Sequence, residues 1–425
     1  MSVSSRAIAA LKELQKDTPD FDILADFPST GELKESGVFN SDRGETLRSL
    51  LSDTEWEGLR NCGLLNSHYT KPETIAQMWR VVLHYIKPTK VIDIGCGTLG
   101  FLRHAPPIAL NKLQRYVGVE KDPIAARIAS KHPSKVVSIY NRDIDDFSYP
   151  EPFDLAIGNI PFVGCKRSIP FDNATPSMEL HYRCFWHIYQ SLSPGGIACI
   201  LTSISTLDSS GHEPTEFRKY LDRRMEFLGA VRLPPGSSVD GRSQVTTDIV
   251  LLRKRYRLLE GSHNPWVYTA HIDRSPDLRI NLHYRDRPGC LLGELTVDRL
   301  TGKRVGLKPN PLAVDLIFEK LTGVATTMTD TYNDEIVPSL RDLGADVKWI
   351  RDHLEREIAD LRQRNEDLKL LVDLRSQEDW DALQKKAEDL EQENAKLKSQ
   401  LRAIAGEPPK DSDIDIDNLN PEDLI

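Results

Sequence analysis

Short apolar runs and helical patterns alternate along the chain from about residue 88. Seven runs read as strands, over residues 90–95, 115–120, 136–140, 154–159, 196–203, 227–233 and 248–255. Segments with helical periodicity separate several of them, over 123–132, 177–193 and 213–224. Strand–helix alternation predicts an α/β fold with a parallel sheet and helices on both faces. Ligands of such sheets bind at the carboxyl ends of the strands.

The flanking segments differ from this α/β pattern. The N-terminal stretch reads as an amphipathic helix, because it lacks the long apolar core and cleavage site of a signal peptide. Residues 256–345 suggest short strands and turns. We expect five parts: a helical segment (1–60), the α/β domain (61–258), a small accessory region (259–345), a coiled coil (346–405) and a disordered acidic tail (406–425).

Heptad spacing predicts the C-terminal α-helical coiled coil. Leu383, Leu390, Leu397 and Ile404 recur every seven residues, and Asn394 falls at a core position between them. A single buried asparagine at such a position favours a parallel dimer in register. We expect a homodimer through this segment. The alternatives are a protein partner that binds the helix, or a solvated helix that packs on its own domain.

Charge is spread unevenly along the chain. The formal net charge is −9, but residues 331–425 hold 25 Asp and Glu against 14 Lys and Arg, a net of −11. Residues 1–330 therefore carry about +2, which is compatible with a polyanionic partner. No apolar run reaches the length of a membrane span, and we expect a cytoplasmic protein, associated with the nucleoid if its source is bacterial.

The six cysteines do not have the spacing of a metal site. Several lie in apolar runs, where a free cysteine behaves as a small hydrophobic residue, and we expect structural thiols in a reducing compartment. They are Cys62, Cys96, Cys165, Cys184, Cys199 and Cys290.

Candidate chemistry lies where three successive strands end. The residues are Asp93, Gly95 and Gly97 after the first run, Glu120 at the end of the second, and Asp143 after the third. Glycines let a backbone loop approach a ligand closely, and an acidic residue after the second strand can accept hydrogen bonds from a ribose. The glycines complete neither G-x-G-x-x-G nor D-x-G-x-G-x-G, because Leu99 stands where the third glycine would fall. The alternative is a tight strand–helix turn with ordinary helix caps.

The fourth run ends in Asn159-Ile160-Pro161-Phe162, and in this motif the chain resembles the N6-adenine DNA methyltransferases of the amino-methyltransferase class. Their hallmark at this strand end is Asn-Pro-Pro-Tyr/Phe. The isoleucine departs from that form and is similar to the NxPF subgroup of phage and mobile-element proteins that join a methylase to a helicase. The likeness covers roughly residues 25–300, with a Tyr-Thr-Pro element in 64–79, the fifth strand and a closing hairpin, in the gamma order of motifs.

The resemblance implies a Rossmann-like S-adenosylmethionine-dependent methyltransferase domain over 61–258, with 259–345 as an accessory or target-recognition region. It also implies the cofactor contacts. Asp93, Gly95 and Gly97 would border the methionine end, Glu120 would hold the ribose, Asp143 would accept from the adenine amino group, and Tyr69, Thr70 and Pro72 would close the methionine pocket. His68 and His181 lie beside motif residues and read as structural histidines.

The implied chemistry accounts for the residue types of the catalytic motif. Adenine N6 is a poor nucleophile, because its lone pair is delocalised into the ring. The Asn159 side-chain oxygen and the Ile160 carbonyl would accept hydrogen bonds from N6 and localise that lone pair. Pro161 would stiffen the loop, and Phe162 would stack on the extruded base. Transfer is then an in-line displacement on the sulfonium methyl group, for which orientation supplies most of the gain.

Two other functions stay open on these residues. An RNA or protein-amide methyltransferase of the same fold would face the same lone-pair problem at its acceptor nitrogen. A non-catalytic, dimeric DNA-binding or scaffold protein with a vestigial methylase fold is kept open by Leu99 and Ile160.

Overall fold

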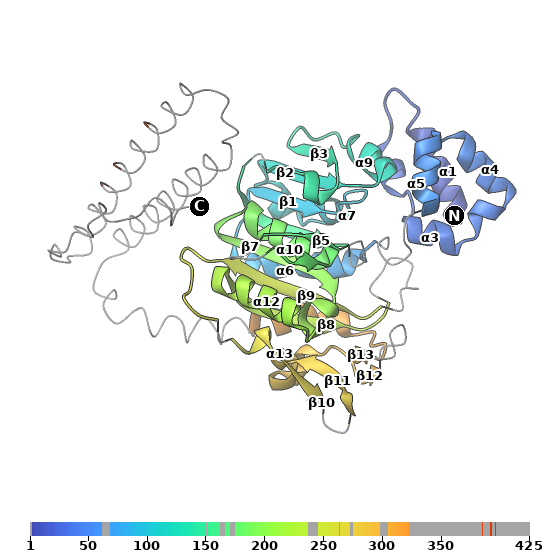
Figure 1. Ribbon diagram of the computed structural model, residues 1–425. Coiled ribbons are helices and arrows are strands. Elements are labelled where there is room, and N and C mark those ends of the chain that lie inside the picture. Colours follow the sequence, from blue (N-terminus) through green and yellow to red (C-terminus); the bar gives the residue numbers. More distant parts are fainter. Residues whose placement is uncertain are drawn as a thin grey trace. The chain divides into compact units, whose positions relative to one another are not determined.

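Seven strands form the central sheet of the computed structural model, at the places that the apolar runs predict (Figure 1). They are β1 (Lys90–Ile94), β2 (Arg115–Glu120), β3 (Val137–Asn141), β4 (Phe153–Asn159), β7 (Leu192–Ser203), β8 (Met225–Leu233) and β9 (Thr247–Lys254). The structure describes residues 2–61, 69–149, 151–161, 166–170, 175–236, 245–262, 264–272, 275–297 and 305–323, together with residues 385, 392 and 396.

The strand order is β3-β2-β1-β4-β7-β9-β8. The strands from β3 to β7 pair in parallel, whereas β9 runs antiparallel to both β7 and β8. The predicted α/β class is confirmed, and the sheet is mostly parallel. The exception is β9, which belongs to the closing hairpin β8–β9 that the resemblance implies. Chain order reverses between β1 and β4, so the topological switch point lies at the carboxyl ends of these two strands.

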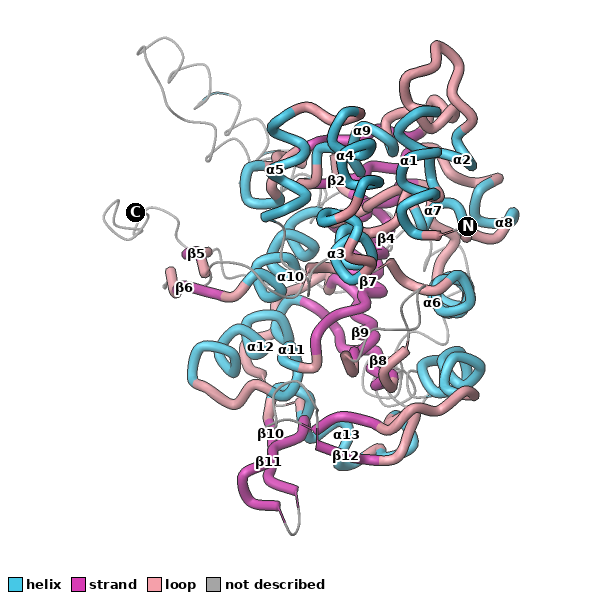
Figure 2. Tube along the Cα trace, turned by 90° about the vertical axis from the view of Figure 1, so that its right-hand side faces the viewer, coloured by secondary structure: helices cyan, strands magenta, loops and turns pink. Residues whose placement is uncertain are grey.

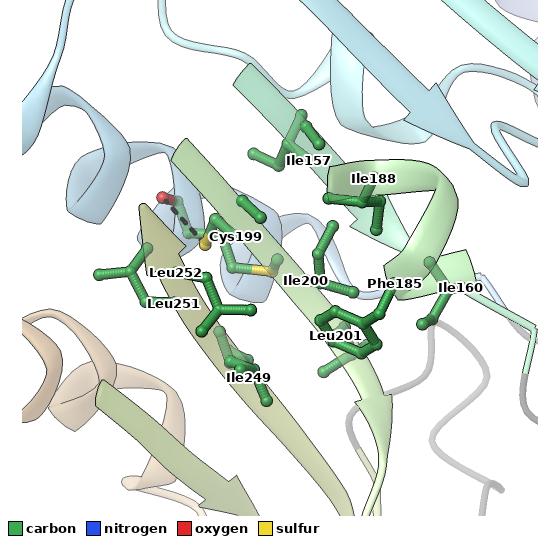
Figure 3. Close-up of a cluster of buried hydrophobic side chains, with 14 of the residues drawn as sticks. Ile157, Ile160, Phe185, Ile188, Cys199, Ile200, Leu201, Ile249, Leu251 and Leu252 are labelled. Carbon is green, nitrogen blue, oxygen red and sulfur yellow. Dashed lines mark hydrogen bonds between the residues drawn. The ribbon is translucent and has the colours of Figure 1, made fainter. Parts of the chain in front are cut away.

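Helices cover both faces of the sheet. Helices α10 (Leu180–Ser191) and α12 (His212–Arg224) lie on one side of β4, β7 and β9, and α6 (Pro72–Tyr85) lies on the other (Figure 2). Figure 3 shows both contacts at β7, where Cys199 faces the Met78 carbonyl of α6 at 4.0 Å, while Phe185 and Ile188 of α10 pack on the opposite face. These faces form one continuous apolar core.

The N-terminal helices pack around an apolar core of their own. They are α1 (Val3–Glu13), α2 (Phe21–Ala25), α3 (Thr30–Glu35), α4 (Asp42–Ser49) and α5 (Asp53–Asn61). Ser29 and Glu32 start α3 with reciprocal hydrogen bonds to each other's backbone N–H, a capping box. Ile124 and Ile128 of α9 (Pro123–Ala129) belong to the same core, so the helical cluster is anchored just after β2.

Short elements follow the sheet, as the sequence predicts for this region. They are β10 (Thr269–Ile272), β11 (Ser275–Asn281), α13 (Leu282–Asp286), β12 (Leu295–Val297), β13 (Val305–Leu307) and a helix over 313–323. Trp266, Tyr284 and Ile317 from this region are buried in the same core as the sheet. Asp222 of α12 ties the region down, because its carboxylate accepts hydrogen bonds from Ser262, Asn264 and Trp266.

The predicted coiled coil and acidic tail lie outside the described residues, apart from three helical positions, Lys385, Gln392 and Lys396. The coiled coil and its dimer therefore stay predictions. Among the described cysteines, Cys96, Cys184, Cys199 and Cys290 are buried free thiols, and Cys62 and Cys165 lie outside the described residues. None of the helices in the described part of the chain is long and apolar enough to cross a membrane.

Candidate functional site

A glycine-containing loop leaves β1 at the switch point. Gly95 and Gly97 have φ of 77° and 54°, and Leu99, the residue just before α7 (Gly100–Arg103), has φ of 66°. Leu99 thus adopts the left-handed conformation that glycine would adopt at no steric cost, while its side chain is fully buried in the core. The missing third glycine therefore does not change the path of the loop, and core packing offsets the strain.

The loop lies between two other predicted motifs. A Cβ atom on Gly95 would lie 3.5 Å from both the Asn159 carbonyl oxygen and Pro161 Cδ. A Cβ atom on Gly97 would lie 2.8 Å from Tyr69 Cε1, closer than a side chain tolerates. Residues that are far apart in sequence therefore meet at the carboxyl ends of β1 and β4, and glycine is required where the tyrosine ring packs on the loop.

Glu120 closes β2 beside this loop and is half-buried. Its carboxylate accepts hydrogen bonds from the backbone N–H of Gly97 at 2.8 Å and of Asp122 at 2.7 Å. Burial, together with the nearby charge of Asp122, raises the pKa of Glu120 to about 7, although these N–H groups favour the ionised form. The Glu120 carboxylate thus holds the glycine loop in place from the end of β2, the position that the resemblance assigns to ribose binding.

Asp93 lies beneath the loop and not at its surface. The side chain is fully buried, accepts a 2.7 Å hydrogen bond from the Tyr116 hydroxyl, and leaves only glycine room at position 158, where a Cβ would lie 2.6 Å from Asp93 Oδ1. Burial raises the pKa of Asp93 to about 7, against the lowering effect of Tyr116. Asp93 therefore supports the end of β1 from below the loop, and its border with the methionine end of a cofactor stays a prediction.

The pKa of Asp93 predicts how stability changes with pH. A carboxyl whose folded-state pKa of about 7 exceeds its usual value near 4 binds more protons in the folded state between those pH values. Its ionisation therefore costs stability as pH rises from 4 to 7. We compare the unfolding free energy of Asp93→Asn with that of wild type at each pH. We expect the variant's advantage to be larger at pH 8 than at pH 4, by an amount on the order of a few kcal/mol.

Urea unfolding of both proteins across this pH range measures that difference. Asp154→Asn serves as the control, because Asp154 is a carboxylate of the same sheet that accepts three hydrogen bonds from Thr89 and Lys90 at the opposite strand end. A stability difference for Asp93→Asn that stays constant with pH would show that the carboxyl is not held protonated near neutrality.

Asp143 follows β3 and is engaged by cations. Its carboxylate pairs with Lys121 at 2.8 Å and with Arg167 at 3.5 Å, and it also accepts the Asp145 N–H at 3.3 Å. Partial burial raises the pKa of Asp143, but the hydrogen bond and charge of Lys121, with Arg167 and Arg183, outweigh it and hold the pKa below its usual value. Asp143 is thus an ionised acceptor at the end of β3.

The Asn159–Phe162 motif continues from β4. The Ile160 N–H donates to the Leu201 carbonyl at 3.2 Å, which extends the β4–β7 ladder past Asn159. The Ile160 side chain is buried beside Phe185 and Leu201 (Figure 3). Proline at this position has no N–H to donate, so isoleucine anchors the motif in a way that proline cannot. Phe162 lies outside the described residues.

The Tyr69-Thr70-Lys71-Pro72 stretch enters α6 next to the loop. Pro72 is the first residue of the helix, and the buried Thr70 hydroxyl has no hydrogen-bond partner in the described part of the chain. Burial raises the pKa of the Tyr69 phenol, and the carboxylates of Asp122 and Glu120 raise it further. His181 is fully buried at the start of α10, and His68 lies outside the described residues.

Sequence reasoning missed several residues that support this site. Thr98 and Arg103 both donate to the Ala25 carbonyl, and Thr30 donates to Asp122, so the N-terminal helices clasp the loop and the end of β2. The partners are 73 to 92 residues apart in sequence, and periodicity within a segment carries no signal for such pairs.

Comparisons with known proteins give weak similarities. No family model matches the sequence. Defense against restriction protein B of Escherichia phage P1 is 27% identical over 197 residues, which cover 45% of this chain and only 8% of that protein. The chain therefore spans less than a tenth of the length of this relative.

Solved structures with low similarity include three methyltransferase chains. The methyltransferase subunit of a type I restriction-modification system from Streptococcus thermophilus is 15% identical, with a TM-score of 0.39 over 58% of this chain and 64% of that one. The M protein of the type I restriction enzyme EcoKI is 15% identical, with a TM-score of 0.36 over 80% and 92%. The N-methyltransferase NodS of Bradyrhizobium japonicum, in complex with S-adenosylhomocysteine, is 14% identical, with a TM-score of 0.30 over 59% and 98%.

Proposed function

We propose that this chain is an S-adenosylmethionine-dependent methyltransferase that acts on the N6 amino group of adenine in DNA. The observation that carries the proposal is the closeness of the glycine loop to Asn159 and Pro161 at the switch point, where a Cβ atom on Gly95 would lie 3.5 Å from each. A methyl donor and its acceptor must approach to about 3–3.5 Å in line. A cofactor loop beside a base-binding motif is the arrangement that such an approach needs.

The residues at the site fit S-adenosylmethionine. Glu120 offers carboxylate acceptors at the end of β2, and Gly97 keeps the loop open to close approach beneath Tyr69. The buried Thr70 hydroxyl, without a partner among the described residues, is a polar group that a bound ligand would satisfy. When bound, the cofactor supplies an electrophilic methyl group on its sulfonium sulfur.

The chain itself would orient the acceptor. Asn159 and the Ile160 carbonyl would accept the two N6–H groups, which localises the nitrogen lone pair toward the methyl group. The core packing of Ile160 and its hydrogen bond to Leu201 hold that carbonyl in place, and Pro161 lies beside Gly95, where a Cβ atom would come within 3.5 Å of its ring. The methylated amino group then releases its extra proton to water.

One observation favours DNA as the acceptor, and a second is compatible with it. The name of the phage P1 relative refers to restriction, a process directed at DNA. The net charge of about +2 over residues 1–330 permits contact with a polyanion. The gamma order of motifs, restriction-modification context and a homodimer through the coiled coil are parts of the same proposal.

Transfer of a labelled methyl group from S-adenosylmethionine tests the function. The acceptors are adenine-unmethylated DNA, RNA of matched sequence and a mixture of proteins, and products are digested and identified as free nucleosides or amino acids. We expect labelled N6-methyl-2′-deoxyadenosine, and we expect labelled product only in the DNA sample. Label in RNA or in protein amides would overturn the DNA assignment, and absence of both binding and transfer would favour the non-catalytic alternative.

Glu120→Ala is expected to weaken cofactor binding about 10- to 100-fold. Loss of charge-assisted hydrogen bonds costs about 1.5–3 kcal/mol, and the N–H of Gly97 loses its acceptor as well. Isothermal titration with S-adenosylhomocysteine measures the effect. Asp146→Ala is the matched control, because Asp146 is an exposed carboxylate near the same edge that pairs with none of the described residues. Equal affinity in Glu120→Ala and wild type would contradict the cofactor assignment.

A further inference from the structure

Three basic side chains that follow the Asn159–Phe162 motif in the sequence contact the Asp145 carboxylate. Arg167 Nη1, in β5 (Arg167–Ser168), lies 2.9 Å from Asp145 Oδ2. Arg183 of α10 pairs with the same oxygen, and His187 Nε2 lies 3.3 Å from Oδ1. Arg183 and His187 are four residues apart on one helix and so lie on the same face.

Asp145 is held next to Asp143, the predicted contact of the cofactor's adenine amino group. Asp143 Oδ1 caps the short helix Ile144–Asp146 by accepting the Asp145 N–H. Arg167 reaches both carboxylates with different nitrogens, Nη1 to Asp145 and Nη2 to Asp143 at 3.5 Å. One guanidinium therefore joins the chain just beyond the base-binding motif to the adenine end of the proposed cofactor pocket.

The three partners of Asp145 differ in exposure. The Arg183 side chain is 2% exposed, so its pair with Asp145 is a buried structural bond whose loss would leave an uncompensated charge. The Arg167 side chain is 43% exposed, and its two bonds are screened by water. Exclusion of that water strengthens the attraction between these charges, because the local dielectric constant falls.

We propose that Arg167 is a positioning residue that couples cofactor binding to the placement of the base-binding motif. This inference rests on the proposed function. A cofactor adenine seated at Asp143 removes water from the Asp143–Arg167–Asp145 bridge and tightens it. The tightened bridge holds β5, which begins six residues after Pro161, in place, so DNA binds more strongly to the cofactor-loaded protein. By linkage, DNA strengthens cofactor binding by the same factor.

The test compares Arg167→Gln with Lys166→Gln in the full-length protein. Lys166 is the neighbouring exposed cation and makes no ion pair within the described residues. Each substitution removes one positive charge, but only Arg167→Gln removes the bridge. For each protein, the dissociation constant for unmethylated duplex DNA is measured without and with saturating S-adenosylhomocysteine, and the ratio of the two is the coupling factor. We expect about tenfold coupling in wild type and Lys166→Gln, and less than about twofold in Arg167→Gln.

Other readouts separate positioning from loss of folding or of cofactor. Arg167→Gln is expected to bind S-adenosylhomocysteine within about threefold of wild type in the absence of DNA and to lose most of kcat at saturating cofactor and DNA. Arg167→Lys restores charge but cannot span two carboxylates, so we expect partial recovery of the coupling factor. Two results overturn this inference and leave the proposed function standing. One is a wild-type protein that binds cofactor and methylates DNA but whose DNA affinity does not change with cofactor, and the other is an Arg167→Gln variant with the full coupling factor. A wild type that binds no cofactor overturns the proposed function with it.

Discussion

Asn159→Ala is expected to lower the rate of methyl transfer to DNA by about 10²–10³-fold while cofactor affinity stays within a few-fold of wild type. Asn159 ends β4 with its backbone carbonyl beside Gly95, and the next residue is fixed by core packing and by the Leu201 hydrogen bond. The alanine side chain leaves that backbone intact. It removes the amide oxygen that would accept one N6–H, an interaction that gains strength as the nitrogen lone pair localises.

Single-turnover transfer with saturating labelled cofactor measures this effect, and titration with S-adenosylhomocysteine measures binding separately. Asn111→Ala is the matched control, because Asn111 is an exposed asparagine after α8 (Pro107–Leu110) and lies away from the switch point. Transfer by Asn159→Ala at a rate near that of wild type would show that the motif does not position the acceptor. A parallel loss of cofactor affinity would assign Asn159 to the cofactor pocket instead.

The positions of the strands could be predicted from the sequence because each strand is a local pattern. Runs such as 90–95 and 115–120 are mostly apolar, as strands buried on both faces usually are, and the polar residues near their carboxyl ends mark the edge where chemistry lies. Gly95, Gly97, Glu120 and Asn159 are brought together by topology alone. The direction of β9 follows from its hairpin with β8, a pairing that strand–helix alternation does not predict.

Buried charges could not be predicted in the same way. Arg183 on α10 and Arg232 on β8 look like solvated positions, since a charged side chain in an amphipathic segment is usually exposed. The carboxylates that neutralise them, such as Asp145 and Asp208, lie 38 and 24 residues earlier in the chain. The position of Asp93 beneath the loop follows only from its three-dimensional contact with Tyr116, and its border with the cofactor stays a prediction.

Arg232 holds the most completely buried charge network in the described part of the chain, and Arg232→Met is expected to destabilise the protein by about 3–5 kcal/mol at pH 8. The side chain is fully buried and donates to both oxygens of Asp248, at 2.7 and 2.9 Å, and to Asp208 at 2.7 Å. A further bond to the Val305 carbonyl and the Tyr284 ring, 4.5 Å from the guanidinium carbon, join β8 to the accessory region.

The substitution leaves Asp208 and Asp248 buried together with no cation between them. Burial lowers the pKa of Arg232, but the two carboxylates outweigh it and hold that pKa above its usual value, so the guanidinium is charged in the wild type. Without the arginine, burial and mutual repulsion disfavour the ionised forms of the two carboxyls in the folded protein. Their ionisation then costs stability above their unfolded pKa, and protonation relieves the cost as pH falls. We therefore expect the destabilisation to be clearly smaller at pH 5 than at pH 8.

Guanidinium unfolding at the two pH values measures this change, with Arg253→Met as the control. Arg253 lies on the adjacent strand β9 and pairs with Glu226 at 3.4 Å, but its side chain is 28% exposed, so its loss should cost less than about 1 kcal/mol. Because Asp208 also accepts the Asn281 N–H at 2.9 Å, residues 264–323 should become more sensitive to proteolysis in Arg232→Met before the sheet itself unfolds. Equal destabilisation at pH 5 and pH 8 would show that a packing defect, and not the unpaired carboxylates, limits stability, because a cavity left by a neutral side chain does not titrate.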